Sequence, residues 1–254
     1  MINFIKKIKV TQTRPFKGNN GISIKSSSRY IPDWYKKIPT RYLTKTHNPK
    51  YEIHGINLPF RMLIIGGSGA GKTSTLLNII HNMPDTFNNI YVITKNKKEP
   101  LYEYLEDKLF NKGLSIVEGI DNAPDLDEDI SKEDQTLIVM DDLVLEKNQK
   151  LLEEYFIRAR KQNCSLIYIS QSYYAVPPMI RKNLNYLVIK RLANLPDLFR
   201  IMREYSLGID KKKLLKIYEI CTENKRDFLL VDLDSEPEDR FRKNFNDIFD
   251  LGKN

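Results

Sequence analysis

The sequence predicts an α/β protein in which helices cover both faces of a mostly parallel central sheet. Short apolar runs typical of buried strands alternate along the chain with helical segments of roughly 10 to 15 residues, which is the pattern of parallel sheets. The first of these runs, Phe60–Gly67, is continuously apolar and ends in glycines, as a strand buried on both faces does. With 254 residues, of which 41% are hydrophobic, the chain is long enough for one large domain with smaller appendages.

The predicted elements follow one another in order from Phe60. The first helix has an apolar stripe at helical spacing and stops before Pro84. The second helix has Pro100 in its first turn, where the missing N–H costs nothing. The acidic segment Asp121–Gln135 is too polar and too broken to form a core element. The predicted strands are Phe60–Gly67, Asn89–Lys95, Leu114–Gly119, Gln135–Leu143, Ser165–Ser172, Asn185–Arg191 and Asp227–Leu233, and the predicted helices are Thr73–Met83, Glu99–Phe110, Gln149–Asn163, Asp197–Tyr205 and Lys212–Cys221.

The N-terminal residues 1–57 differ in composition from the rest of the chain. They contain scattered basic residues, several prolines and the only tryptophan, Trp34, close to Tyr30 and Tyr35. This composition predicts an extended arm that its aromatic side chains anchor, either on its own domain or on a neighbouring subunit. We therefore expect an arm at residues 1–57, the main domain at residues 58–240 and a polar tail at residues 241–254.

The composition narrows the classes of partner and compartment. The formal net charge of +8 favours a polyanionic partner, nucleic acid before membrane, although a solvated lysine-rich surface gives the same charge. No apolar run approaches the ~18 residues of a membrane-spanning helix, and the N-terminus lacks the apolar core of a signal peptide. Cys164 and Cys221 lie far apart, which predicts reduced thiols, and none of His47, His54 and His81 pairs with a cysteine at zinc-ligand spacing.

The stretch LIIGGSGAGKTS, at Leu63–Ser74, contains a complete phosphate-binding pattern, Gly-x-x-x-x-Gly-Lys-Thr. It follows a predicted strand and opens a predicted helix, a setting in which loop amides and the helix N-terminus bind phosphates. The pattern predicts ATP with Mg²⁺, with Lys72 on the β- and γ-phosphates and the Thr73 hydroxyl on the metal; the alternative is a loose turn with a surface lysine. The expected nucleotide-binding residues are Gly66, Gly67, Ser68, Gly69, Ala70, Gly71, Lys72, Thr73 and Ser74.

Two acids follow a later strand. The run LIVMDD places Asp141 and Asp142 directly after apolar residues. Because burying two carboxylates without a cation is costly, the pair predicts a metal ligand, Asp141, and a residue that orients or deprotonates the attacking water, Asp142. A pair that only caps the following turn is the alternative. Two neighbouring acids favour hydrolysis over phosphoryl transfer to a small molecule, so the main domain is expected to be an ATPase.

The strand SLIYISQS ends in the polar residues Ser170, Gln171 and Ser172. Open α/β sheets bind their ligands at such carboxyl ends. In ATPases of the additional-strand type, this strand lies between the strand of the phosphate loop and the strand of the metal acid, and Gln171 would then face the γ-phosphate. A polar strand end that simply meets solvent is the alternative.

Taken in order and spacing, GGSGAGKTS, LIVMDD, the helix ending FIRARKQN and the strand SLIYISQS resemble the FtsK–HerA superfamily of P-loop ATPases, over roughly residues 58–235. Within it, the chain is most similar to the DNA-packaging ATPases of poxviruses, giant viruses and virophages. The resemblance implies a three-layer P-loop NTPase fold of the additional-strand type. It also implies a homo-oligomeric ring, commonly a hexamer, that pumps double-stranded DNA with a capsid or portal partner, in the host cytoplasm or the virion rather than outside the cell.

Arg158 and Arg160 are the candidates for the arginine that such a ring supplies to a neighbour's nucleotide. They are two residues apart on one predicted helix, hence about 200° around it, so both cannot point at one site. If one arginine reaches the neighbour's nucleotide, the other pairs with Glu154 or faces solvent. Many members of the superfamily have Gly-Arg-His where this chain has Ala159-Arg160-Lys161, which leaves the basic residue in place.

A translocase contacts DNA through basic residues on loops that touch phosphates without reading bases. Tyr173 and Tyr174 lie either in a loop whose position changes with the bound nucleotide or in the core. The alternatives to a packaging motor are a cellular translocase or helicase, a small-molecule kinase and a scaffold with a degenerate nucleotide site. The candidate DNA contacts, among which the sequence does not decide, are Lys95, Lys97, Lys98, Arg181, Lys182, Lys211, Lys212 and Lys213.

Overall fold

A computed structural model describes residues 32–109, 113–205 and 207–251 of the chain, which divides into two units at residues 1–44 and 45–254. In the first unit, the 3₁₀ turn η1 spans Thr40–Tyr42, and the side chains of Trp34 and Tyr35 are exposed. Tyr30, the third member of the expected aromatic cluster, lies outside the described residues. The anchoring of this cluster stays a prediction.

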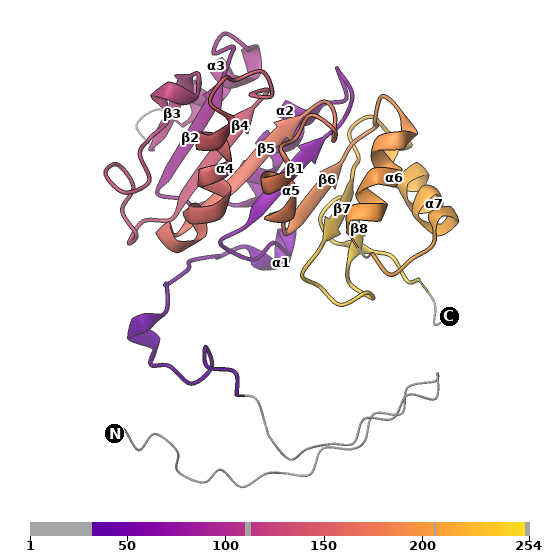
Figure 1. Ribbon diagram of the computed structural model, residues 1–254, viewed down its shortest axis with the longest axis horizontal. Helices are drawn as coiled ribbons and strands as arrows, with labels where there is room; N and C mark the ends of the chain where they lie inside the picture. Colours follow the sequence, from indigo (N-terminus) through magenta and orange to yellow (C-terminus); the bar gives the residue numbers. More distant parts are fainter. Residues whose placement is uncertain (1–31, 110–112, 206, 252–254) are drawn as a thin grey trace, which may run out of the picture. The chain divides into compact units, whose positions relative to one another are not determined.

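The second unit is built around a nine-stranded sheet with the order β3-β2-β4-β5-β1-β6-β7-β8-β9 (Figure 1). The strands from β3 to β6 in this order pair in parallel, and β7, β8 and β9 extend the sheet by antiparallel pairing. Every strand predicted from an apolar run is present. The strands are β1 (Arg61–Ile65), β2 (Asn89–Thr94), β3 (Leu114–Glu118), β4 (Thr136–Asp141), β5 (Cys164–Ser170), β6 (Tyr186–Ile189), β7 (Leu229–Asp232), β8 (Phe241–Lys243) and β9 (Asp247–Ile248).

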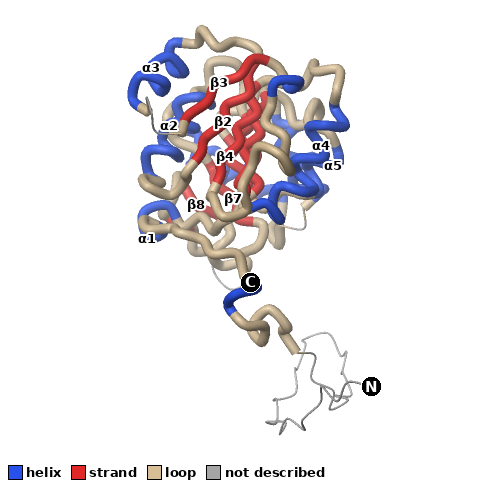
Figure 2. Tube along the Cα trace, turned by 90° about the vertical axis from the view of Figure 1, so that its left-hand side faces the viewer, coloured by secondary structure: helices blue, strands red, loops and turns tan. Residues whose placement is uncertain are grey.

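Helices cover both faces of this sheet, which confirms the predicted three layers (Figure 2). On one face, α2 and α3 bury Leu76 and Leu105, and α1 contacts α2. On the other face, α4, α6 and α7 bury Phe156, Leu198 and Leu214, with α5 beside α4. The helices are α1 (Tyr51–His54), α2 (Lys72–Asn82), α3 (Pro100–Lys108), α4 (Gln149–Arg158), α5 (Pro178–Lys182), α6 (Leu195–Glu204) and α7 (Lys211–Thr222), with 3₁₀ turns η2 (Ile120–Asn122) and η3 (Ala159–Gln162). Within the described residues, none of these helices has the length and apolarity of a membrane span.

The parallel register brings the carboxyl ends of β1, β2, β4, β5 and β6 to one edge of the sheet, here called the carboxyl edge. Ile65 pairs with both Ser170 and Ile189, and Asp141 pairs with both Ile169 and Thr94. The strand β5 lies between β1 and β4, as predicted for an ATPase of the additional-strand type. The loops that carry the predicted nucleotide-binding groups therefore leave the sheet at the same edge.

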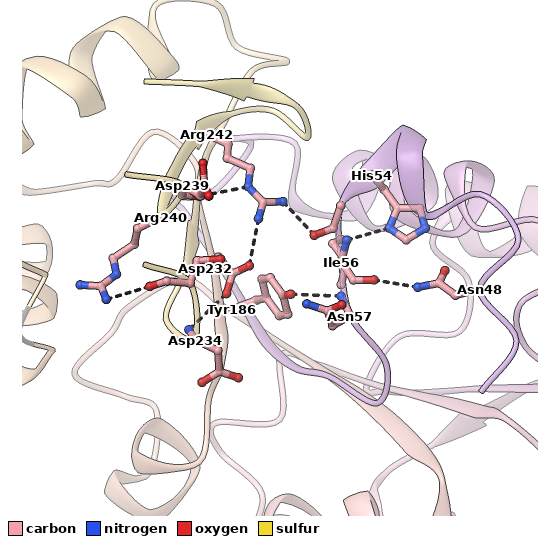
Figure 3. A network of polar contacts seen from close by, with 12 residues as sticks. Asn48, His54, Ile56, Asn57, Tyr186, Asp232, Asp234, Asp239, Arg240 and Arg242 are labelled. Carbon is pink, nitrogen blue, oxygen red and sulfur yellow. Dashed lines mark hydrogen bonds and ion pairs between the residues drawn. The ribbon is translucent and has the colours of Figure 1, made fainter. Parts of the chain in front are cut away.

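The expected boundaries of the main domain differ from the structure at both ends. Residues 45–57 belong to the second unit, and part of the expected tail forms β8 and β9. The reason is a network of polar contacts around Arg242, which is buried and forms an ion pair of 2.9 Å with Asp232 (Figure 3). Arg242 also donates a hydrogen bond to the Gly55 carbonyl oxygen at 2.8 Å. The polar composition of this segment suggested a tail, but Arg242 is paired with Asp232 inside the fold and Phe241 is buried.

The acidic segment Asp121–Gln135 also contributes more to the fold than its composition predicted. Leu126 and Ile130 are buried in the larger apolar cluster. The hydroxyl of Tyr155 on α4 donates a hydrogen bond to the carbonyl oxygen of Pro124. Asp127 adds an ion pair with Arg158 at the end of α4. Contacts between residues distant in the sequence therefore tie this loop to α4, and periodicity does not reveal such an arrangement.

Candidate functional site

The phosphate loop joins β1 to α2, as its pattern predicted. Gly69 and Gly71 have φ angles of +68° and +85°, a conformation that L side chains rarely adopt. The N–H of Gly67 donates to the Arg191 carbonyl oxygen at 2.9 Å, which fastens the loop to the end of β6. Ser68 and Ser74 are exposed, and Ala70 is buried beneath the loop. The loop is therefore held by backbone contacts while its outer side stays open.

Lys72 is the first residue of α2 and reaches back across the loop. Its Nζ donates to the carbonyl oxygens of Gly66 at 3.0 Å and Gly67 at 3.1 Å. Burial lowers the pKa of Lys72, and the carboxylates of Asp141, Asp142 and Glu99 oppose that effect. The amine thus lies close to the acids at the carboxyl edge and can bind phosphate oxygens there as a point charge.

Asp141, the last residue of β4, is buried and is held by Tyr102 of α3. The Tyr102 hydroxyl donates to Asp141 Oδ2 at 2.5 Å. Burial raises the pKa of Asp141 to about 6, the hydrogen bond from Tyr102 opposes that rise, and the charge of Glu99 adds to it. A buried carboxylate with a raised pKa is a group that a nearby cation stabilises in its charged form.

Asp142 and Gln171 lie at the same edge with exposed side chains. Asp142 has a φ angle of +55°, in the left-handed region, and its N–H donates to the Ile169 carbonyl oxygen at 3.3 Å. Gln171 follows Ser170, the last residue of β5, which pairs with Ile65 at the start of the phosphate loop. The structure therefore brings the phosphate loop, Asp141, Asp142 and Gln171 together at the carboxyl edge.

Arg158 and Arg160 lie at the opposite edge. Arg158 ends α4 and forms ion pairs with Asp127 and Glu154. Arg160 is in η3, just before β5, and its charge contributes, after burial, to the lowered pKa of Arg61 at the start of β1. The 7 residues of β5 span roughly 20 Å, since a strand rises about 3.3 Å per residue. Both arginines are thus remote from the phosphate loop of their own chain.

The structure adds two side chains that sequence reasoning missed, Tyr102 and Lys190. Lys190 directly follows β6 and is only 1% exposed; its Nζ donates to the Arg226 carbonyl oxygen at 2.9 Å. Burial lowers the pKa of Lys190 to about 8, against the charge of Asp227. The sequence could have indicated Lys190, because this lysine directly follows the apolar residues of a predicted strand. The sequence around Tyr102 does not distinguish it from an ordinary core tyrosine.

The oxygen donors at this edge fit Mg²⁺. Thr73, half-buried at the start of α2, offers a hydroxyl, and Asp141 offers a carboxylate. Within the described part of the chain, no cluster of three or more His, Cys, Asp or Glu side chains could hold a metal by itself. Mg²⁺ in nucleotide sites is held by one or two protein groups together with substrate phosphates and waters, so this donor set suits it.

Comparison with known proteins gives relatives in sequence and in fold. The DNA packaging protein OPG160 of Variola virus and that of Vaccinia virus (strain Copenhagen) are each 25% identical over 143 residues, covering 52% of this chain and 53% of the relative. The chain thus spans about half the length of the curated relatives that it matches.

Two solved structures share the fold. The genome packaging NTPase B204 from Sulfolobus turreted icosahedral virus 2, in complex with AMPPCP, has a TM-score of 0.53 at 16% identity, covering 74% of this chain and 98% of that one. The pCW3 conjugation coupling protein TcpA with ATPγS has a TM-score of 0.52 at 14% identity, covering 78% and 62%. A family model described as Poxvirus A32 protein matches residues 52–236, which is most of the chain. The chain therefore belongs to the Poxvirus A32 protein family.

Proposed function

We propose that this chain is an ATPase that moves double-stranded DNA, in a ring that packages a viral genome. The observation that carries the proposal is the meeting of Lys72, Asp141, Asp142 and Gln171 at one sheet edge, in a strand order with β5 between β1 and β4. Membership of a family with relatives named DNA packaging proteins supports DNA as the cargo. The net charge of +8 suits a polyanionic partner.

The residues at the carboxyl edge divide the chemistry of hydrolysis among them. Loop amides and Lys72 would bind the phosphates of ATP, and Thr73 with Asp141 would hold Mg²⁺, which supplies charge neutralisation when bound. Asp142 would orient and deprotonate the attacking water, because its exposed carboxylate projects from the residue after the metal acid. Gln171, directly after β5, would contact the γ-phosphate and report whether it is present.

An arginine from a neighbouring subunit would complete the site. The placement of Arg158 and Arg160 at the opposite edge supports action in trans, because neither lies near the phosphate loop of its own chain. Such a ring, a hexamer in our proposal, would act with a capsid or portal component in the host cytoplasm or the virion.

ATP turnover by the parent chain and by Lys72→Ala, each with and without double-stranded DNA, tests this proposal. We expect DNA to stimulate turnover, and the variant to lose it by at least about a hundredfold, since the amine stabilises transition-state charge. Mass measurement of the assembled particle runs alongside. A monomer whose turnover ignores DNA would refute the motor, strand separation on a forked duplex would favour a helicase, and a phosphorylated small molecule would indicate a kinase.

A further inference from the structure

The structure separates the basic clusters that the sequence left equivalent as DNA contacts. Arg181 is only 6% exposed and forms an ion pair of 3.0 Å with Glu204, so it belongs to the core. The Lys211 amine lies 3.8 Å from the centroid of the Phe199 ring, and Lys213 donates to a carbonyl oxygen near the C-terminus. These three residues are engaged in the fold and are poor candidates for phosphate contacts.

The segment Lys95–Lys98, here called the lysine loop, differs from these three residues. All three of its lysines are exposed, and no described acid forms an ion pair with Lys97 or Lys98. The N–H of Asn96 donates to Thr94 Oγ1 at 3.2 Å, and the N–H of Lys98 donates to Asn96 Oδ1 at 3.2 Å. The loop is therefore shaped by hydrogen bonds from its backbone N–H groups to the side-chain oxygens of Thr94 and Asn96, and it leaves two amines available to an anionic partner.

The lysine loop starts directly at the carboxyl edge of the sheet. Thr94, the residue before it, pairs in register with Asp141. Lys95 lies 3.7 Å from Glu146, in the loop that follows Asp141 and Asp142. One end of the lysine loop is thus joined to the segment that carries both acids.

The other end of the lysine loop leads into α3 and reaches the metal acid through Tyr102. Glu99 directly precedes α3, and the N–H of Tyr102 donates to the Glu99 carbonyl oxygen at 2.9 Å. Tyr102 is fully buried, and its hydroxyl donates to Asp141 Oδ2 at 2.5 Å. The orientation of the Asp141 carboxylate and the position of the first turn of α3 are therefore linked by a direct contact.

We propose that the lysine loop is the DNA-phosphate contact and that Tyr102 is the positioning residue that couples it to the nucleotide site. The inference rests on the proposed function. A change at Asp141 when nucleotide binds or leaves alters the acceptor of the Tyr102 hydroxyl, and the first turn of α3 carries that change to the adjoining lysines. Because coupling between two sites is reciprocal, a DNA phosphate bound by Lys97 and Lys98 favours one orientation of the Asp141 carboxylate.

Binding of a fluorescent double-stranded DNA to the full chain, over a range of salt concentrations, tests the contact. For Lys97→Gln/Lys98→Gln we expect about a tenfold loss of affinity and a slope of log K against log salt that is smaller by about two, because each phosphate contact contributes about 0.9. The matched control is Lys182→Gln/Lys212→Gln, which removes the same charge from exposed positions outside the loop. Thermal unfolding of both variants checks that they fold.

The control defines the outcomes. A small effect of the control beside a large effect of the loop variant supports the assignment. Equal losses, or no loss in the loop variant, overturn it. If the parent chain itself binds no DNA, or if its DNA-stimulated turnover does not depend on Lys72, the proposed function fails, and with it the basis of this inference.

Tyr102→Phe tests the coupling, because it removes the hydroxyl and keeps the ring. For the parent we expect DNA affinity measured with and without AMPPCP and Mg²⁺ to differ by at least about fivefold, within the usual range of coupling between sites. In the variant we expect that ratio to move to about one. A purely structural role would lower stability but leave the ratio unchanged. A retained ratio, or a ratio of one in the parent, overturns the coupling.

Discussion

Gly66 leaves no room for a side chain at the start of the phosphate loop. A Cβ on Gly66 would lie 2.6 Å from the Cβ of Lys190, which is fixed to its own backbone and cannot rotate away. Gly69 differs, because a Cβ there meets nothing within 4 Å and only its φ angle of +68° disfavours a side chain. The two glycines are therefore required for different physical reasons.

We expect Gly66→Ala to lower both the unfolding temperature and the nucleotide affinity more than Gly69→Ala does. The second change costs about 1–2 kcal/mol of backbone strain. Gly66 has no left-handed φ angle, so the first change costs overpacking instead, typically about 1–3 kcal/mol, because it forces β1 and β6 apart. Thermal unfolding with nucleotide titration measures both effects. Similar losses in the two variants would contradict the assigned contact with Lys190.

Asp142 is predicted to act on the attacking water rather than as a turn cap. Because asparagine tolerates a left-handed backbone well, Asp142→Asn removes the charge and keeps the φ angle of +55°. We expect ATP turnover to fall by about a hundredfold or more with little change in nucleotide affinity, as for loss of a general base. Steady-state turnover and equilibrium nucleotide binding measure this. Unchanged turnover would favour the turn-cap interpretation.

At the scale of elements, the short helix α1 places His54 in a fully buried position. Its Nδ1 accepts the N–H of Ile56 at 3.0 Å, and its Nε2 has no hydrogen-bond partner among the described residues (Figure 3). Burial lowers the pKa of His54 to about 4, against the charge of Glu52. Folding therefore favours the neutral imidazole.

This residue makes stability depend on pH. Between an unfolded pKa of about 6.5 and the folded value, the unfolded chain binds a proton at His54 that the folded chain does not, so its contribution to stability falls as the pH falls. His54→Asn keeps a short polar side chain near Ile56 and removes the titration. We expect the parent to lose unfolding free energy relative to this variant across that interval, measured by denaturant unfolding. A difference that is the same at every pH would refute the assignment.

At the scale of the whole molecule, the two arginines lie at the edge of the sheet opposite the phosphate loop of their own chain. Arg158 is held by Asp127 and Glu154, and Arg160 has no described ion pair. We therefore expect Arg160, rather than Arg158, to act in trans. In the assembled particle, Arg160→Ala should lower turnover by about a thousandfold, as loss of such an arginine does in related chemistry, and Arg158→Ala serves as the matched control.

Mixed assemblies distinguish action in trans from a folding defect. Lys72→Ala and Arg160→Ala subunits, inactive separately, should recover part of the turnover when assembled together, because some boundaries then pair an intact phosphate loop with an intact arginine. Turnover of Arg160→Ala assemblies equal to the parent would contradict the assignment, and so would a larger loss in Arg158→Ala.

The sequence by itself determined the fold class, the predicted strands and the residues that lie at the carboxyl edge of the sheet. This was possible because the phosphate loop, the acids after β4 and the amide after β5 each belong to a contiguous stretch, and parallel pairing of continuous apolar runs brings strand ends together. The sequence did not determine the boundaries of the main domain. It did not predict β8 and β9, because these strands are short and carry charged residues.

Only the tertiary structure decided which distant side chains meet. Tyr102 and Asp141 are 39 residues apart, and Gly55 and Arg242 are 187 residues apart. The same packing buries Lys190 beneath Gly66 and engages Arg158 and Arg181 in ion pairs within the fold. Local spacing encodes the period of a helix or strand and the conformation of a loop. The partner of a buried polar group depends on how complete elements pack, which no single stretch of sequence contains.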